Sequence, residues 1–248
     1  TLQMSLIIIG NYGGYSIKEY CKIFWVGLMD GDGSIQVNHW NKKYLQFRFV
    51  IKLKNTLANK NMLIFLAKNI GGNVRIISNE KFVIWVENDI EKIIIYEISN
   101  IYPPLTSRKY YQLLLKKKFI NNTKDIDNYF NERNNKYSVH PFIQSSSYPH
   151  YYGTWLSGFI EAEGCFSIRA NNNHSFSIEQ NDDKFLLIYI KEYFCIQSQV
   201  NQRKNTNFFV LETYRKSTFV NINNHFSKFP LLGEKKISYL RFIDLTSM

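Results

Sequence analysis

An internal repeat constrains this chain more than any other feature of its sequence. The segment FWVGLMDGDGSI at residues 24–35 returns as WLSGFIEAEGCF at residues 155–166. Gly27 pairs with Gly158 and Asp32 pairs with Glu163, at one constant offset along the chain. A long internal similarity of this kind is typical of a protein built from copies of one structural unit. The chain is therefore predicted to have pseudo-twofold symmetry.

The sequence that follows each copy predicts the same order of elements. Residues 44–54 alternate strictly between apolar and polar side chains, as in a half-buried strand with a basic outer face. Residues 59–72 predict a helix that ends at glycine, and residues 106–120 predict another after a pair of prolines. Each unit therefore reads as α-β-β-α-β-β-α, and the fold class as α+β.

Four segments follow from this organisation. Residues 1–23 are an N-terminal extension, 24–121 the first repeat and 153–248 the second, and the polar, Asn- and Ser-rich residues 122–152 are a linker.

The 248 residues carry a formal net charge of +11. A folded chain this basic is expected to meet a polyanion, and nucleic acid is the first candidate. No apolar run approaches the roughly 18 residues that a membrane-spanning helix needs.

Two alternatives compete for the acidic motif GLMDGDGSI. A calcium loop aligned on Gly33 would need oxygen ligands at positions occupied by Leu28 and His39, and therefore fails. A simple helix stop, with Gly33 as the terminating glycine, stays open for one copy taken alone. The repeat weakens this second alternative, because a carboxylate at a helix C-terminus is unfavourable and here occurs twice. A bound cation would compensate for both carboxylates.

The spacing of small residues supports a shared site. Gly27 and Gly31 are four residues apart, as are Gly158 and Ala162, and small residues at this interval let two helices approach closely. If the two helices pack on one another, Asp32 and Glu163 emerge side by side. Two neighbouring carboxylates form an oxygen-rich site suited to Mg²⁺.

Both strings resemble the LAGLIDADG motif, and the chain is similar to the monomeric, two-repeat LAGLIDADG homing endonucleases from Phe24 to its C-terminus. The resemblance implies two saddle-shaped antiparallel sheets that bind DNA and pack together through the motif helices. It also implies an intron-encoded, site-specific endonuclease that cuts both DNA strands at a long asymmetric target. An organelle-encoded protein of this kind is expected in the mitochondrion.

The resemblance also implies roles for particular residues. Asp32 and Glu163, with the backbone of Gly31 and Ala162, would hold two or three divalent ions. These ions would be Mg²⁺, with Mn²⁺ or Ca²⁺ able to substitute for binding. Basic residues near the scissile phosphate match Lys235 and, in the first copy, Arg108 with Lys109 adjacent. Gln180 matches a polar residue that holds water, whereas the first copy has Leu53 there. Asp30 and Glu161 would serve local hydrogen bonding.

The outward side chains of the strands are the candidates for DNA contact, because Gln, Asn and Arg can read base edges in the major groove. They are Gln36, Asn38, Trp40, Gln46, Arg48, Lys52, Arg75, Ser167, Arg169, Asn171, Ser177, Glu179, Asn201 and Arg203. Each of them could instead be an ordinary solvated strand residue.

Two alternative functions stay open. One is a maturase, an RNA-binding protein that assists intron splicing, and the other is a DNA-binding repressor with a dead site. The presence of both Asp32 and Glu163 favours the nuclease.

The three cysteines have no disulfide or zinc spacing and are expected to pack inside as small apolar residues.

Overall fold

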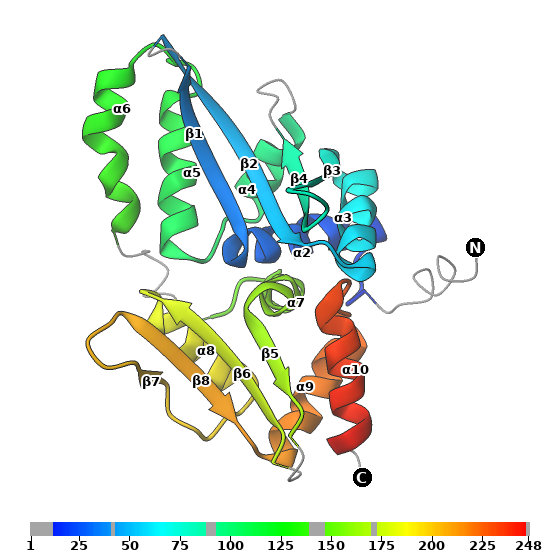
Figure 1. Ribbon diagram of the computed structural model, residues 1–248. Coiled ribbons are helices and arrows are strands. Elements are labelled where there is room, and N and C mark those ends of the chain that lie inside the picture. Colours follow the sequence, from blue (N-terminus) through cyan, green and yellow to red (C-terminus); the bar gives the residue numbers. More distant parts are fainter. Residues whose placement is uncertain (1–11, 41–42, 88–92, 139–146, 170–172, 247–248) are drawn as a thin grey trace.

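The computed structural model describes residues 12–40, 43–87, 93–138, 147–169 and 173–246. Its two sheets have four strands each, in the orders β1-β2-β4-β3 and β5-β6-β8-β7, and every neighbouring pair is antiparallel. Figure 1 shows the first sheet above and the second below, with helices α2 and α7 between them. The predicted α+β class with two repeats is confirmed.

The elements of the first repeat follow the predicted α-β-β-α-β-β-α order and end in one further helix. They are α2 (Ile17–Gly31), β1 (Gly33–Trp40), β2 (Tyr44–Lys54), α3 (Leu57–Ile70), β3 (Asn73–Ile77), β4 (Phe82–Glu87), α4 (Ile93–Ile101) and α5 (Ser107–Phe119). The second repeat has the same order. Its elements are α7 (Tyr152–Glu163), β5 (Gly164–Ser167), β6 (Ser175–Asn181), α8 (Lys184–Tyr193), β7 (Asn201–Gln202), β8 (Phe208–Thr213), α9 (Lys216–Lys228) and α10 (Glu234–Thr246).

Helix α2 begins earlier than the first repeat was predicted to begin. Ser16 caps it by accepting a hydrogen bond from the backbone N–H of Glu19 at 3.2 Å. The side chains of Tyr20, Cys21 and Ile23 are fully buried in the core. The predicted boundary at residue 24 therefore divides one continuous helix, because the apolar face of that helix extends toward its N-terminus.

Helices α2 and α7 pack so closely that side chains are excluded from the contact. A Cβ on Gly27 would lie 1.9 Å from the carbonyl oxygen of Trp155, and one on Gly158 would lie 2.0 Å from that of Phe24. A Cβ on Gly31 would lie 2.3 Å from the Cβ of Ala162. The small residues at the predicted spacing thus bring the two backbones together at the centre of the molecule.

The segment between the repeats is partly folded, which its polar composition did not predict. It contains α6 (Ile126–Glu132) and a 3₁₀ helix, η1 (Arg133–Tyr137). Ile126 packs with Leu45 and Phe47 of β2 and with Phe119 of α5 in a small core cluster of their own. Residues 122–152 are therefore more than a linker, because Ile126, with the partly buried Tyr129 and Phe130, packs apolar side chains against the first repeat.

The burial of the cysteines corrects another expectation. Cys21 is buried, but Cys165 and Cys195 are exposed, so the prediction that all three pack inside is wrong for two of them. Cys165 lies on the outward side of β5, opposite Ser177 of β6.

No helix among the described residues has the length and apolar character to cross a membrane.

His225 is a buried histidine at the end of α9, enclosed by aromatic rings. Its Nε2 lies 3.0 Å from the hydroxyl of Ser157, and its Nδ1 lies 3.1 Å from the hydroxyl of Tyr193. The rings of Phe194 and Phe226 also contact it. Burial lowers the pKa of His225 to about 3, so the folded protein holds this imidazole neutral.

This burial predicts a loss of stability in acid. The unfolded chain protonates His225 below about pH 6.5, whereas the folded chain does not. The free energy of unfolding should therefore fall as pH drops from 6.5 toward 3, by about 2 kcal/mol at pH 5 from this residue alone. Melting temperatures at pH 7.5 and pH 5 check this: His225→Gln should narrow the difference, and His39→Gln, at an exposed histidine, should not. Equal differences in all three proteins would contradict the account.

Candidate active site

Asp30 is a structural acid that fixes the segment leading into α5. Its carboxylate accepts hydrogen bonds from the backbone N–H of Leu105 at 2.8 Å and of Thr106 at 3.3 Å. It also accepts from the Thr106 hydroxyl at 2.6 Å and, across the repeat boundary, from the indole N–H of Trp155 at 2.7 Å. The predicted role in local hydrogen bonding is confirmed for this residue.

Glu161 does the same for α10. It accepts hydrogen bonds from the backbone N–H of Leu232 at 3.2 Å, Gly233 at 3.0 Å and Lys235 at 2.8 Å. A Cβ on Gly233 would lie 2.7 Å from the Glu161 carboxylate, so glycine makes room for it. The predicted role of Glu161 is also confirmed, and in each repeat the earlier acid of the motif anchors the last helix.

The later acids, Asp32 and Glu163, emerge where the two central helices end. Asp32 follows the last residue of α2 and donates its backbone N–H to the carbonyl of Leu28. Glu163 is the last residue of α7. A Cβ on Gly31 would lie 3.3 Å from the Glu163 carboxylate, which places this carboxylate against the end of α2.

The glycines after these acids are not left-handed helix stops. Gly33 and Gly164 open strands β1 and β5, and neither is among the glycines with positive φ. A Cβ on Gly33 would lie 2.4 Å from the carbonyl oxygen of Met29, and one on Gly164 would lie 2.5 Å from the side chain of Ile160. These positions need glycine because the chain turns from helix to strand against its own last turn.

The two later acids have raised pKa values in the protein. Removal from water raises the pKa of Asp32 to about 6, although part of its surface stays in contact with solvent, and Lys235 and Lys109 oppose the rise. Burial raises the pKa of Glu163 to about 7, the negative charge of Asp32 adds to this, and the same two lysines oppose it. The site therefore gathers two carboxylates that repel one another between two ammonium groups.

Lys109, rather than Arg108, is the basic residue of the first repeat whose charge acts on the acids. Burial lowers the pKa of Lys109, and the charges of Asp30, Glu163 and Asp32 oppose the fall. Arg108 is exposed and lies with Lys109 and Glu163 in the lining of one recess. The sequence carried a signal for this: Lys109 stands as far after Pro104 as Lys235 stands after Pro230.

Gln180 lies near Glu163, and its counterpart in the first repeat is apolar. Gly164 of β5 pairs with Ile178 of β6 as Gly33 of β1 pairs with Ile51 of β2, so Gln180 and Leu53 occupy equivalent places. Gln180 and Glu163 line the same recess, together with Lys235, whereas Leu53 is buried in the core. The surroundings of the two acids are therefore asymmetric.

The donor set fits a divalent ion that a substrate helps to hold. Across the residues that the structure describes, no group of three or more His, Cys, Asp or Glu side chains could hold a metal ion. Mg²⁺ is commonly bound through one or two carboxylates completed by substrate phosphates and water. Asp32 and Glu163 supply two carboxylates, and partial burial together with the negative charge of Asp32 raises the pKa of Glu163, so a nearby cation would favour the ionised forms.

The open faces of both sheets carry the predicted DNA-contact residues. On the first sheet, Gln36 stands opposite Arg48, and Asn38 stands opposite Gln46. Asn38, Gln46, Lys52, Arg75, Arg169, Asn201 and Arg203 are exposed, and Gln36, Arg48, Ser167, Ser177 and Glu179 are half-buried. The side chain of Trp40, and Asn171 as a whole, lie outside the described residues.

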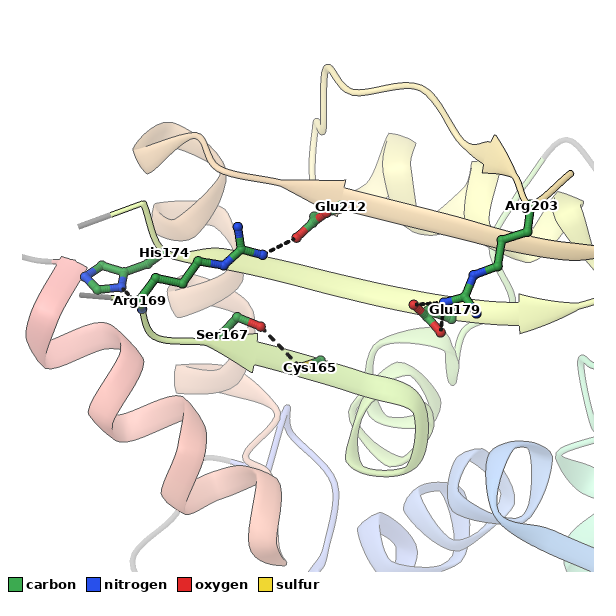
Figure 2. A network of polar contacts seen from close by, with 7 residues as sticks. All are labelled: Cys165, Ser167, Arg169, His174, Glu179, Arg203 and Glu212. Carbon is green, nitrogen blue, oxygen red and sulfur yellow. Dashed lines mark hydrogen bonds and ion pairs between the residues drawn. The ribbon is translucent and has the colours of Figure 1, made fainter. Parts of the chain in front are cut away.

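The second sheet pairs its arginines with carboxylates. Figure 2 shows Arg169, which follows β5, reaching over β6 to Glu212 of β8. Arg203, which follows β7, reaches over β8 to Glu179 of β6. The nitrogen–oxygen distances are 3.3 Å and 3.0 Å respectively. Arg203 also lies over the ring of Phe208, with its guanidinium 4.2 Å from the ring centre. On the first sheet, Lys52 instead lies over the ring of Phe82 at 4.1 Å.

Comparisons with known proteins point to one family. The model of the LAGLIDADG endonuclease family matches residues 25–120 and 156–246, one match in each repeat. A protein of Dictyostelium citrinum named "Probable intron-encoded endonuclease aI3" is 46% identical over 236 residues, covering 90% of this chain and 94% of that protein. A protein of the same name in Debaryomyces hansenii is 40% identical, over 91% of this chain but only 38% of its own length.

Solved structures share the fold. The I-LtrWI LAGLIDADG homing endonuclease, solved with its target DNA, superposes with a TM-score of 0.72 at 21% identity. The match covers 93% of this chain and 91% of the other. Because the family model matches both repeats and a relative this similar spans nearly the whole chain, the protein belongs to the LAGLIDADG endonuclease family.

Proposed function

We propose that this protein is a site-specific DNA endonuclease that hydrolyses a phosphodiester bond in each strand of a long asymmetric duplex target. One observation carries the proposal. Two closely packed, repeat-related helices end at Asp32 and Glu163, Lys109 and Lys235 each line a recess with Glu163, and the charges of both lysines act on both acids. Two carboxylates flanked by two cations match what metal-assisted phosphodiester hydrolysis requires.

The chain's own residues have distinct tasks in this reaction. Asp32 and Glu163 would hold divalent ions at the site, together with the backbone of Gly31 and Ala162. Bound metal of this kind lowers the pKa of water and stabilises charge on phosphate oxygens. Lys109 and Lys235 stabilise the negative charge that develops at the scissile phosphates, and Arg108 extends this positive surface. Gln180 orients water beside Glu163. The two acids share one site, whereas Lys109 and Lys235 are related by the repeat and each serves one strand.

The open faces of the sheets supply target recognition. The Gln, Asn and Arg side chains on neighbouring strands lie side by side, in the arrangement a two-stranded ribbon needs to read base edges in the major groove. Lys and Arg at the edges contact phosphates, so binding weakens as salt rises. The carboxylates paired with Arg169 and Arg203 make the second face less positive than the first.

Endonucleases of this family depend on divalent metal ions in general. We propose Mg²⁺ as the working ion, in two or three copies, with Mn²⁺ or Ca²⁺ substituting for binding.

Intron-encoded relatives support an organelle gene, and we propose that the protein acts as a monomer in the mitochondrion. Those relatives are named as endonucleases, which does not favour the RNA-binding maturase alternative, and the presence of both acids argues against a dead-site repressor.

A cleavage assay tests the proposal. The substrate is duplex DNA spanning the insertion point of the host intron, incubated with Mg²⁺ or with EDTA. We expect cutting of both strands with Mg²⁺ and none with EDTA, because the described residues provide two carboxylates and no full metal cage. Metal-independent cutting, or tight intron-RNA binding without DNA cutting, would contradict the proposal.

A further inference from the structure

The helices that carry the two active-site lysines are each held by the opposite repeat. In α5, the Thr106 hydroxyl donates to Asp30 and does not cap the helix, so the first N–H groups need another acceptor. Asp183 of the second repeat provides it. Its buried carboxylate accepts the backbone N–H of Ser107 at 2.9 Å and the Ser107 hydroxyl at 2.5 Å.

At α10 the roles of the two repeats are reversed, because a residue of the first repeat holds this helix of the second. The residue before this helix is Gly233, which has no side chain to cap it. Asn59 of α3, in the first repeat, accepts the backbone N–H of Glu234 at 3.2 Å. Asn59 is itself fixed, because its side-chain amide donates to the carbonyl of Lys54 at 3.1 Å. Asp183 and Asn59 each stand at the start of the helix that follows the second strand of their repeat.

These bonds fix the parts of the chain that position the lysines. Lys109 lies in the first turn of α5, two residues after the residue that Asp183 holds. Lys235 directly follows Glu234, which Asn59 holds. The other acceptors at these helix ends, Asp30 and Glu161, come from the same repeat as the helix. Each lysine is therefore placed by one acceptor from its own repeat and one from the other.

We propose that Asp183 and Asn59 are positioning residues that act across the repeat boundary, Asp183 on Lys109 and Asn59 on Lys235. Each repeat thereby controls cleavage of the strand that the lysine of the other repeat serves. The inference rests on the proposed function, since it requires that the two lysines act on different strands. Loss of one contact should slow one strand and leave the other, because misplacing a catalytic group by about 1 Å can cost about 100-fold in rate.

The experiment measures the two strands separately. A duplex spanning the intron insertion point carries a different label on each strand, and both cleavage rates are followed with Mg²⁺. Lys109→Met and Lys235→Met first define which strand each lysine serves. We expect Asp183→Ala to change the ratio of the two rates about tenfold in the direction of Lys109→Met. Asn59→Ala should change it in the direction of Lys235→Met.

Three further variants serve as a rescue, a control and a substitute for Asp183→Ala. Asp183→Asn retains one acceptor for the Ser107 N–H and should recover most of the ratio. Asp127→Asn removes an exposed carboxylate from α6, outside the recesses that Glu163 lines, and should leave the ratio unchanged. If Asp183→Ala fails to fold, as judged by thermal melting, Ser107→Ala removes the hydroxyl donor from the other side and should shift the ratio in the same direction.

The outcomes separate two failures. Equal slowing of both strands, or an unchanged ratio in a folded variant, would overturn the positioning role. Wild-type protein that cuts neither strand would instead overturn the proposed function on which this inference rests.

Discussion

Asp32→Asn and Glu163→Gln should each reduce cleavage of both strands by about 10³-fold or more, as removal of one strong electrostatic stabiliser does in other enzymes. Both substitutions keep the shape of the side chain and remove the charge that holds the metal. The two helix ends share one site, since Asp32 acts on the pKa of Glu163, so either loss affects both strands. Strand-resolved cleavage with Mg²⁺ measures the effect.

DNA binding separates this result from misfolding. Neither acid lies on the open faces of the sheets, and removing a negative charge reduces repulsion of phosphates. Both variants should therefore bind the target at least as tightly as the wild type in a gel-shift assay. Asp127→Asn, which removes an exposed carboxylate from α6, is a matched control that should cut normally. Binding lost in step with cutting would mean that the acids serve the fold.

Gly158→Ala should lower the free energy of unfolding by about 3 kcal/mol or more, the upper end of what overpacking costs. The new Cβ would lie 2.0 Å from the carbonyl oxygen of Phe24, and a backbone atom cannot move aside without separating α2 from α7. For a protein of this size the melting temperature should fall by about 6–12 °C. Cleavage should fall as well, because the helix ends would no longer hold Asp32 and Glu163 together.

Gly153→Ala is the matched control in the same helix. Its new Cβ would meet the ring of Phe229 at 2.6 Å, which is the far end of a side chain that can shift. Alanine is favoured over glycine by about 1 kcal/mol in a helix interior, which offsets part of the loss at Gly158, whereas Gly153 lies in the first turn. Gly153→Ala should therefore destabilise far less, as measured by thermal or urea unfolding. Equal losses in the two variants would mean that close backbone contact at Gly158 is not what makes glycine necessary.

Much of the fold was accessible from the pattern of side chains. The alternation in residues 44–54 predicted β2 at its observed bounds, since one buried and one open sheet face impose a period of two. The repeat predicted two equivalent units and the central helix pair. The N-terminal part of α2 and the fold of α6 were missed, because each depends on one or a few apolar side chains that meet partners distant in sequence.

Some features of the active site were likewise accessible from the sequence, and others were not. The sequence by itself determined the pairs of acids, the small residues between them and the difference between Gln180 and Leu53, because these are matters of residue type and spacing. The spacing after proline favoured Lys109 over Arg108, and the tertiary structure decided between them, since adjacent residues on a helix point in different directions and burial decides which charge acts on the acids. Only the tertiary structure showed that Asp183 and Asn59 hold helices of the opposite repeat, because a hydrogen bond between distant residues leaves no local pattern in the sequence.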